Sequence, residues 1–256
     1  MIENSPEGRP AATVVILRDR PVGPPEILMM ERASTMVFAA GALVFPGGAV
    51  DASDQALAAS IGGVLPPDDA AARIAAMRET LEESGLATGL DRPVGMAQAV
   101  AMRETLLGGA SLASVLKDHG VTLDLNLMQP FARWHPSPRE MVRKIFDTRF
   151  YLVRAPDGQE PSVDRTENVR LFWSSAADTL ARCESGDGHV IFPTRCNLLR
   201  LAQFSSVDAI IAHAALIPVE KVTPWIEDRD GESHLCIPAH LGYPVTSEPM
   251  RTVQRT

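Results

Sequence analysis

Short apolar runs alternate along this chain with longer stretches of mixed polarity, and turn residues separate them. The run Ala-Thr-Val-Val-Ile-Leu at 12–17 is continuous enough for a strand that is buried on both faces. A turn rich in proline at 18–25 separates it from a second run at 26–32, so these segments predict a β-hairpin. Further strands are expected at 42–45, 131–134, 145–153 and 169–173, and short strand-like runs alternate with turns at 219–243.

Helical segments are expected between and after these strands. Asp68 and Asp69 are candidate caps for a helix that runs through Ser84, and Gly85 is suited to end it because glycine adopts left-handed backbone angles. Other helices are expected at 94–116, with a break at Gly108-Gly109, and at 175–183, 195–204 and 205–215. Strands followed by helices in this order predict an α/β fold with a mixed sheet between helical layers.

Three carboxylates are concentrated near the end of the first helix, in the segment Arg78-Glu79-Thr80-Leu81-Glu82-Glu83-Ser84-Gly85-Leu86. Glu79, Glu82 and Glu83 have the i, i+3, i+4 spacing that places side chains on one helix face, where like charges repel. Hard Mg²⁺ or Mn²⁺ reverses that repulsion because it binds clustered oxygen ligands. Arg78 stands four residues before Glu82 and can fix its rotamer by pairing with it. The alternative is a solvated acidic helix face, the usual role of a charge run.

This segment and the Gly-Gly turn before it resemble the Nudix box, whose family form is Gly-x5-Glu-x7-Arg-Glu-apolar-x-Glu-Glu-x-Gly-apolar. Gly48 matches the first glycine, Asp54 stands at the position of the first glutamate, and Arg78–Leu86 match the end. Thr80 replaces the usual large apolar residue. The two halves lie thirty residues apart (78 − 48) where the family form has fourteen, and the extra residues fall in a loop-like stretch around 61–67.

The resemblance implies a Nudix-type α/β/α sandwich with a mixed β-sheet and a helical insertion. It implies metal-dependent hydrolysis of a pyrophosphate bond in a nucleoside diphosphate linked to another moiety, with Mg²⁺ or Mn²⁺ as cofactor. The candidate metal ligands are Gly48, through its carbonyl, and Glu79, Glu82 and Glu83; the candidate catalytic residues are Arg78, Glu82 and Glu167; and the candidate substrate-binding residues are Arg32, Phe45, Gly47 and Gly48.

The general base stays open at this point. Any box carboxylate that the metal does not engage could accept the proton, and Glu167 is the candidate outside the box, because family members often recruit this role from a distant loop. A solvated loop glutamate is the alternative for Glu167. Arg32, Arg143, Lys144 and Arg149 are candidates for phosphate recognition or ordinary solvated strand residues.

Further segments resemble the coenzyme A diphosphatases of this family, namely 32–54, 132–134, 146–151, 167–173 and 193–194. The resemblance therefore implies coenzyme A or acyl-coenzyme A as the substrate, with 3′,5′-ADP and (acyl-)phosphopantetheine as products. A second motif of that branch is incomplete here. An ADP-ribose- or NADH-type pyrophosphatase is the alternative among enzymes, and a non-hydrolytic nucleotide sensor of the same fold is the alternative outside them.

Composition and charge exclude several classes of function. The net charge of −8 argues against a nucleic-acid binder, which is normally basic. The sequence has no run of eighteen apolar residues and no signal-like start, and its three cysteines form no Cys-x-x-Cys. We therefore expect a cytoplasmic protein that acts on a small nucleotide-type molecule, without a membrane partner. The sequence does not determine the oligomeric state; dimers are common in the family that it resembles, so a homodimer is a possible assembly.

The chain of 256 residues is long enough for one large domain. We expect a single hydrolase domain at 11–246, a disordered N-terminus at 1–10 and a flexible tail at 247–256, with insertions at about 55–70 and 92–128. The second insertion contains Ala101-Met102-Arg103-Glu104-Thr105, which repeats Ala76-Met77-Arg78-Glu79-Thr80. Because the copy lacks the paired glutamates, we interpret the repeat as coincidence.

Overall fold

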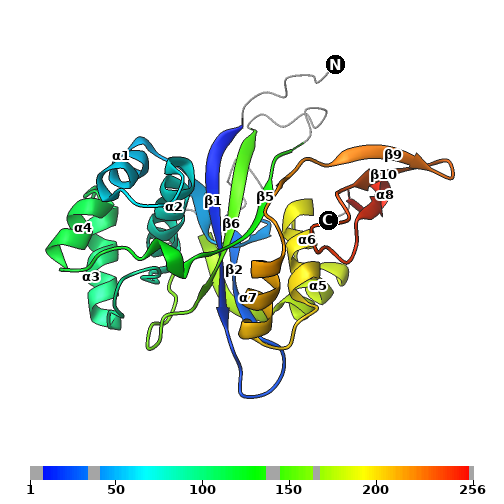
Figure 1. Ribbon diagram of the computed structural model, residues 1–256. Coiled ribbons are helices and arrows are strands. Elements are labelled where there is room, and N and C mark those ends of the chain that lie inside the picture. Colours follow the sequence, from blue (N-terminus) through cyan, green and yellow to red (C-terminus); the bar gives the residue numbers. More distant parts are fainter. Residues whose placement is uncertain (1–7, 34–40, 137–144, 164–167, 254–256) are drawn as a thin grey trace.

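The structure, a computed structural model, describes residues 8–33, 41–136, 145–163 and 168–253. Its centre is a mixed eight-stranded sheet of order β3-β2-β1-β6-β5-β8, in which β4 also pairs with β1 and β7 with β2. Helices cover both faces, so the chain forms the predicted α/β/α sandwich (Figure 1). The strands of this sheet are β1 (Arg9–Arg18), β2 (Glu26–Arg32), β3 (Leu43–Val44), β4 (Gly47–Ala49), β5 (Gln129–Trp134), β6 (Phe146–Arg154), β7 (Asn168–Ser175) and β8 (Lys221–Val222).

Strand β1 lies in the middle of the sheet, which explains its unbroken apolar run. Val14 and Ile16 belong to the core on one face, and Val15 and Leu17 belong to the core on the other, because successive side chains of a strand point to opposite sides. Strand β1 pairs in parallel with β6 and antiparallel with β2. The β1–β2 pairing is the predicted hairpin.

The helices form one layer on each face (Figure 1). One layer contains α1 (Ala52–Ile61), α2 (Pro67–Ser84), α3 (Met96–Leu107) and α4 (Leu112–Asp118). The other contains α5 (Ala176–Glu184), α6 (Phe192–Leu201) and α7 (Val207–Leu216). Within the described ranges, no helix combines the length and the apolar character that a bilayer crossing requires.

Helix α2 ends as predicted, at Gly85, whose φ of 75° is left-handed and whose N–H donates to the Leu81 carbonyl. Its start differs from the prediction, because the N-cap is Pro66 and both Asp68 and Asp69 lie in the first turn. Carboxylates in the first turn still stabilise the helix through its dipole.

The loop predicted around 61–67 is present at 62–66, and the rest of the first insertion is helical. Helix α1 begins where the Asp51 N–H donates to the Asp54 carboxylate at 2.9 Å, and its alanine-rich sequence favours helix. A short loop through Gly62 and Gly63 then leads into α2. The second insertion contains α3, α4 and a short 3₁₀ helix (Leu125–Leu127), with the predicted break at Gly108-Gly109.

Both ends are more structured than predicted. Strand β1 begins at Arg9 rather than Ala12, because Arg9 and Pro10 continue its parallel pairing with β6. The disorder predicted for 1–10 therefore does not hold for these two residues, and 1–7 lie outside the described residues.

The flexible tail predicted for 247–256 is a strand and a short helix over most of its length, β11 (Ser247–Pro249) and α8 (Met250–Val253). Strand β11 pairs with β10 (Glu232–Cys236), which pairs in turn with β9 (Trp225–Arg229). The buried Glu248 carboxylate accepts a hydrogen bond from Arg195 Nε at 3.1 Å, which ties this segment to α6.

Candidate functional site

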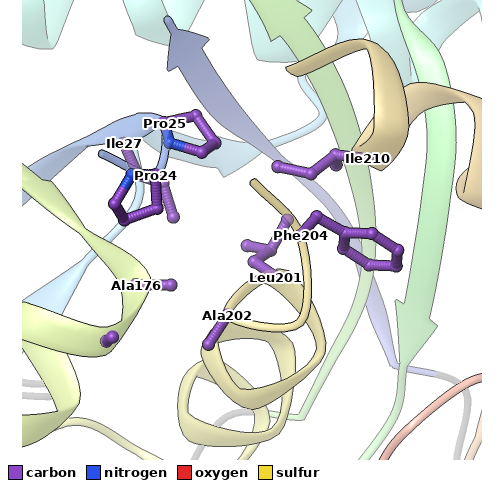
Figure 2. Close-up of a pocket in the computed structure, with 9 residues that line it drawn as sticks. Pro24, Pro25, Ile27, Ala176, Leu201, Ala202, Phe204 and Ile210 are labelled. Carbon is purple, nitrogen blue, oxygen red and sulfur yellow. The ribbon is translucent and has the colours of Figure 1, made fainter. Parts of the chain in front are cut away.

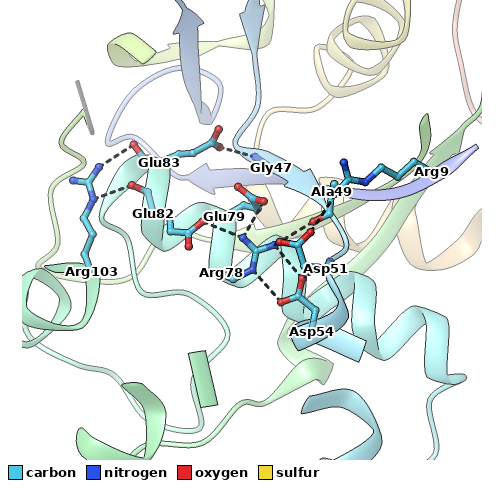
Figure 3. A network of polar contacts seen from close by, with 10 residues as sticks. All are labelled: Arg9, Gly47, Ala49, Asp51, Asp54, Arg78, Glu79, Glu82, Glu83 and Arg103. Carbon is cyan, nitrogen blue, oxygen red and sulfur yellow. Dashed lines mark hydrogen bonds and ion pairs between the residues drawn. The ribbon is translucent and has the colours of Figure 1, made fainter. Parts of the chain in front are cut away.

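The carboxylates of Glu79, Glu82 and Glu83, here called the acidic ridge, lie on the last turns of α2 beside β4 (Figure 3). Gly48 makes this approach possible. A β-carbon at Gly48 would overlap the Glu79 carboxylate, so a larger residue would displace that carboxylate from its place beside the strand. The ridge and the Gly-Gly turn, thirty residues apart in sequence (78 − 48), therefore meet in space as predicted.

Arg78 is the centre of a polar network at this ridge. Its Nη1 donates to Glu79 Oε1 and to Glu82 Oε2, each at 3.0 Å, and its Nη2 donates to the Ala49 carbonyl at 3.1 Å. The Arg78–Glu82 pair predicted from the spacing is thus present. Because the Arg78 side chain is only 10% exposed, these bonds orient the carboxylates more firmly than a solvated pair would.

Asp54 holds the other side of Arg78. Its two oxygens accept hydrogen bonds from Arg78 Nε and Nη2, each at 3.0 Å, and its side chain is 1% exposed. The sequence placed Asp54 at the first glutamate position of the box but gave it no role. A planar, bidentate contact of this kind fixes the guanidinium in one orientation.

Glu83 is held from the opposite side by the backbone of β4. The Gly47 N–H donates to Glu83 Oε2 at 2.8 Å, and Glu83 is buried. A β-carbon at Gly47 would overlap the Ala12 carbonyl, and its φ of 152° lies where glycine is favoured. In this arrangement the Gly47 N–H binds the ridge, so the substrate contact predicted for Gly47 would have to use another of its atoms.

The ridge carries more negative charge than Arg78 balances. Burial raises the pKa of Glu79 to about 7, although Arg78 opposes the shift, and the neighbouring Glu82 adds to it. Burial also raises the pKa of Glu82, again against the influence of Arg78. Both shifts mean that the folded protein becomes more stable when a proton or another cation binds to the ridge.

The raised pKa of Glu79 predicts a pH dependence for the metal-free protein. Folding raises this pKa from 4.5 to about 7, so the stability that the proton contributes is full below pH 4.5 and is lost as the pH rises towards 7. In the presence of a chelator, the melting temperature of the wild type should fall over this range. Glu79→Gln should remove that part of the slope, and an identical slope in both proteins would contradict the assignment.

The ridge fits a hard divalent cation because it offers carboxylate oxygens beside a glycine backbone. Its negative charge also exceeds the positive charge of Arg78. Within the described part of the chain, no three His, Cys, Asp or Glu side chains already stand as a metal-binding group. The reason is visible in Figure 3: Arg78 lies between Glu79 and Glu82, and Glu83 turns to Gly47. Each of these bonds uses one oxygen of a carboxylate, so Glu79 and Glu82 can keep their bonds to Arg78 while a change of side-chain rotamer brings their second oxygens to an ion.

Three candidate residues remain, namely Phe45, Arg32 and Glu167. The Phe45 side chain is buried in the core on the α5–α7 face, where it meets Phe150 edge-on with 6.5 Å between ring centroids. Because a ring packed in this way is not available to a substrate, the substrate contact predicted for Phe45 would have to use its main chain. Arg32 ends β2, and its Nε is buried with no hydrogen-bond partner in the ranges the structure describes. Glu167 lies outside the described residues.

Arg103 of α3 is a site residue that the sequence interpretation missed. Its Nε donates to the Glu82 carbonyl at 2.9 Å and its Nη2 to the Glu83 carbonyl at 3.2 Å (Figure 3). These carbonyls belong to the last turn of α2, where a helix has no internal donors. The repeated pentapeptide was the available signal, because Arg103 occupies in the second copy the place of Arg78 in the first.

Two cavities in the described structure differ in size and in place. The smaller, of about 30 Å³, is apolar and lies near the β1–β2 turn, α5 and α6 (Figure 2). Its volume is close to one water molecule's share of the liquid, so it cannot hold a nucleotide. The larger, of about 380 Å³, lies between α1, the start of α2 and the strands β1, β5 and β6, and is lined by Pro10, Val50, Gln55, Ala59, Pro67, Asp68, Ala71, Arg133, Asp147 and Arg149.

Comparison with known proteins places this geometry in a family. No family model matches the chain. Acyl-coenzyme A diphosphatase NUDT19 of Gallus gallus is 28% identical, in a match that covers 80% of this chain and 69% of the relative. The nudix hydrolase 7 of Caenorhabditis elegans is also 28% identical, over 71% of this chain and 57% of its own length.

A solved structure agrees with this chain in shape as well as in sequence. The crystal structure of a Nudix hydrolase from Alicyclobacillus acidocaldarius superimposes with a TM-score of 0.71 and 30% identity, over 80% of this chain and 96% of that one. The shared fold, the identity over nearly the whole solved chain and the box residues lead to one conclusion. This chain belongs to the Nudix hydrolase family.

Proposed function

We propose that this protein hydrolyses a pyrophosphate bond in a nucleoside diphosphate linked to another moiety, with Mg²⁺ or Mn²⁺ as cofactor. The observation that carries the proposal is the acidic ridge beside β4, where the buried Arg78 binds Glu79, Glu82 and the Ala49 carbonyl. Repelling carboxylates on one helix face do not favour folding, and a cation-dependent reaction explains why they are gathered there.

The ridge carboxylates, Arg78 and Asp54 would have different roles in this reaction. Glu79, Glu82, Glu83 and the Gly48 carbonyl would hold the metal, which when bound neutralises phosphate charge and lowers the pKa of a water molecule. Arg78 orients Glu79 and Glu82, while Asp54 keeps Arg78 in place. A ridge carboxylate that stays outside the metal shell could accept the proton from water, and Glu167 is the other candidate for this role.

Coenzyme A or acyl-coenzyme A is the proposed substrate. The support is the likeness to a protein named acyl-coenzyme A diphosphatase, at 28% identity, together with the sequence segments that resemble this branch. Hydrolysis would release 3′,5′-ADP and (acyl-)phosphopantetheine. An ADP-ribose- or NADH-type pyrophosphatase is the second candidate, and a nucleotide sensor without hydrolysis is the third.

One experiment separates these candidates. Purified protein is incubated with Mg²⁺ or Mn²⁺ and a panel of coenzyme A esters, ADP-ribose, NADH and diadenosine polyphosphates, and the products are identified by mass. Formation of 3′,5′-ADP and phosphopantetheine would support the coenzyme A assignment. AMP from ADP-ribose or NADH would support the second candidate instead. Binding without any product would support the sensor.

The cavity of about 380 Å³ is the proposed site for one half of the substrate, since ligand pockets usually exceed about 300 Å³. Arg133 binds Asp147 through Nε and Nη2 at 2.7 Å each, and among the described residues these bonds leave its Nη1 for an acceptor on the ligand. Helix α1 joins this cavity to the ridge, because Gln55 lines the cavity and the preceding Asp54 binds Arg78.

Filling this cavity should weaken substrate binding. Ala59 lines it and is exposed, so Ala59→Trp can occupy the space without disturbing the core. We expect KM to rise by about 10-fold with a smaller change in kcat, because the contact is made equally in the ground and transition states. Ala56→Trp is the matched control, since Ala56 is exposed on the same helix but does not line the cavity. Equal KM values for the two variants would contradict this placement.

A further inference from the structure

We infer that Arg103 is a positioning residue, which fixes the last turn of α2 and so sets where the Glu82 and Glu83 carboxylates lie. The inference rests on the proposed function, because it assigns those carboxylates a task that depends on their placement. Arg103 does not belong to the Nudix box, since it lies in the helical insertion between α2 and β5.

The contacts of Arg103 join three parts of the chain. Besides the carbonyls of Glu82 and Glu83, its guanidinium binds Ser162 in the loop after β6, where Nη1 donates to the carbonyl at 2.9 Å and to Oγ at 2.8 Å. Arg103 is 8% exposed. One buried side chain from α3 therefore holds the end of α2 against the loop that follows β6.

Other hydrogen bonds also join the loop after β6 to the end of α2 and the chain that follows it. The Ser162 N–H donates to the Ser84 carbonyl at 2.8 Å. The side chain of Gln159 accepts from the Ala87 N–H and donates to the Val94 carbonyl, each at 2.9 Å. The loop after β6 is thus fixed to the chain that leaves α2, and it is the loop that leads towards Glu167. Arg103 lies where these two segments and α3 meet.

The position of Arg103 indicates more than general support of the fold. A cation at a helix C-terminus interacts favourably with the free carbonyls and the helix dipole. Here the two carbonyls belong to the very residues whose carboxylates form the ridge, so a shift of this turn moves both carboxylates together. A displacement on the order of 1 Å at a catalytic group can cost about 100-fold in rate.

The two copies of the pentapeptide therefore act on one helix in different ways. Arg78 binds carboxylates of the ridge through its side chain, from within α2. Arg103 binds the main-chain carbonyls of Glu82 and Glu83, from α3, so Glu82 is held by both arginines. Both arginines are 8% exposed. The first orients the acidic side chains and the second fixes the backbone that carries them.

The test compares Arg103→Lys and Arg103→Met with a matched control, Arg92→Met. Arg92 also lies in the insertion region and donates to two carbonyls, those of His119 and Gly120, but it is exposed and remote from α2 in its contacts. For each protein we would measure the melting temperature, kcat and KM, the Mn²⁺ dissociation constant without substrate, and amide exchange at 82–87.

We expect Arg103→Met to lower kcat and to weaken Mn²⁺ binding, each by about 10-fold or more, as for other residues that orient metal ligands. KM should change far less, and amide exchange at 82–87 should rise. Arg103→Lys keeps the positive charge but loses the planar guanidinium that binds several acceptors at once. Its kcat, Mn²⁺ affinity and amide exchange should therefore lie between those of Arg103→Met and the wild type. Arg92→Met should match the wild type throughout.

Wild-type kcat and Mn²⁺ affinity in both Arg103 variants, measured where they are fully folded, would overturn the inference. So would an equal loss in Arg92→Met. If the wild type hydrolyses nothing in the substrate panel, the proposed function fails separately, and Mn²⁺ affinity together with amide exchange still decides whether Arg103 positions the ridge.

Discussion

Replacing Glu82 or Glu83 with glutamine should lower kcat by about 100-fold or more, because each change removes a charged oxygen donor from the proposed metal site. The melting temperature should stay the same or rise in Glu82→Gln, since burial already disfavours the charged form of this carboxylate and the change relieves repulsion within the ridge. Activity and stability would then move independently, as expected for residues that serve chemistry. Steady-state kinetics and thermal denaturation of the purified variants measure the two effects.

The natural control for this experiment is Glu104→Gln. Glu104 stands in the second pentapeptide where Glu79 stands in the first, but it is exposed and lies on α3. Its replacement should leave kcat unchanged. Full activity in both Glu82→Gln and Glu83→Gln would end the proposed mechanism, whatever substrate is used.

Asp54→Ala should lower the free energy of unfolding by about 3 kcal/mol, which is the usual effect of removing one partner from a buried ion pair. The carboxylate of Asp54 is 1% exposed, so its loss leaves the Arg78 guanidinium without its bidentate partner in a buried place. It also removes the acceptor for the Asp51 N–H at the start of α1. Urea denaturation followed by circular dichroism measures the change.

Asp51→Asn is the matched control for Asp54. The Asp51 side chain is 52% exposed and only 3.7 Å from Arg78 Nη2, and an exposed ion pair contributes less than about 1 kcal/mol. We therefore expect Asp51→Asn to denature nearly as the wild type does. If Asp54→Ala were equally mild, Arg78 would not depend on Asp54 for its place, and the polar network would need a different explanation.

The central strands and most helices could be predicted from the sequence because their signal is local. The apolar run of β1 and the glycine after α2 each reflect a condition that acts within a few residues, namely burial on both faces and a left-handed helix end. The box motif likewise located the acidic ridge and its pairing with Arg78, since both lie on one helix.

What the sequence did not reveal depends on contacts between distant segments. The strand character of Arg9 depends on the parallel neighbour β6, and the ordered end near Glu248 depends on Arg195. Phe45 looked available in the sequence because its position beside the Gly-Gly turn does not show which face of the sheet its ring enters. The role of Arg103 depends on the packing of an insertion onto α2, which no spacing rule describes.

Asp54 lies before the sequence insertion and Arg78 lies after it, and the bond between them closes the loop that the insertion makes. The residues at 59–65 can therefore be shortened, lengthened or exchanged while the reactive groups stay anchored at both ends. Of these residues Ala59 lines the larger cavity, so exchange at this position would alter the proposed binding space while the acidic ridge keeps its place. Because the insertion can vary in sequence while the reactive groups stay in place, new specificities can arise from one ancestral enzyme.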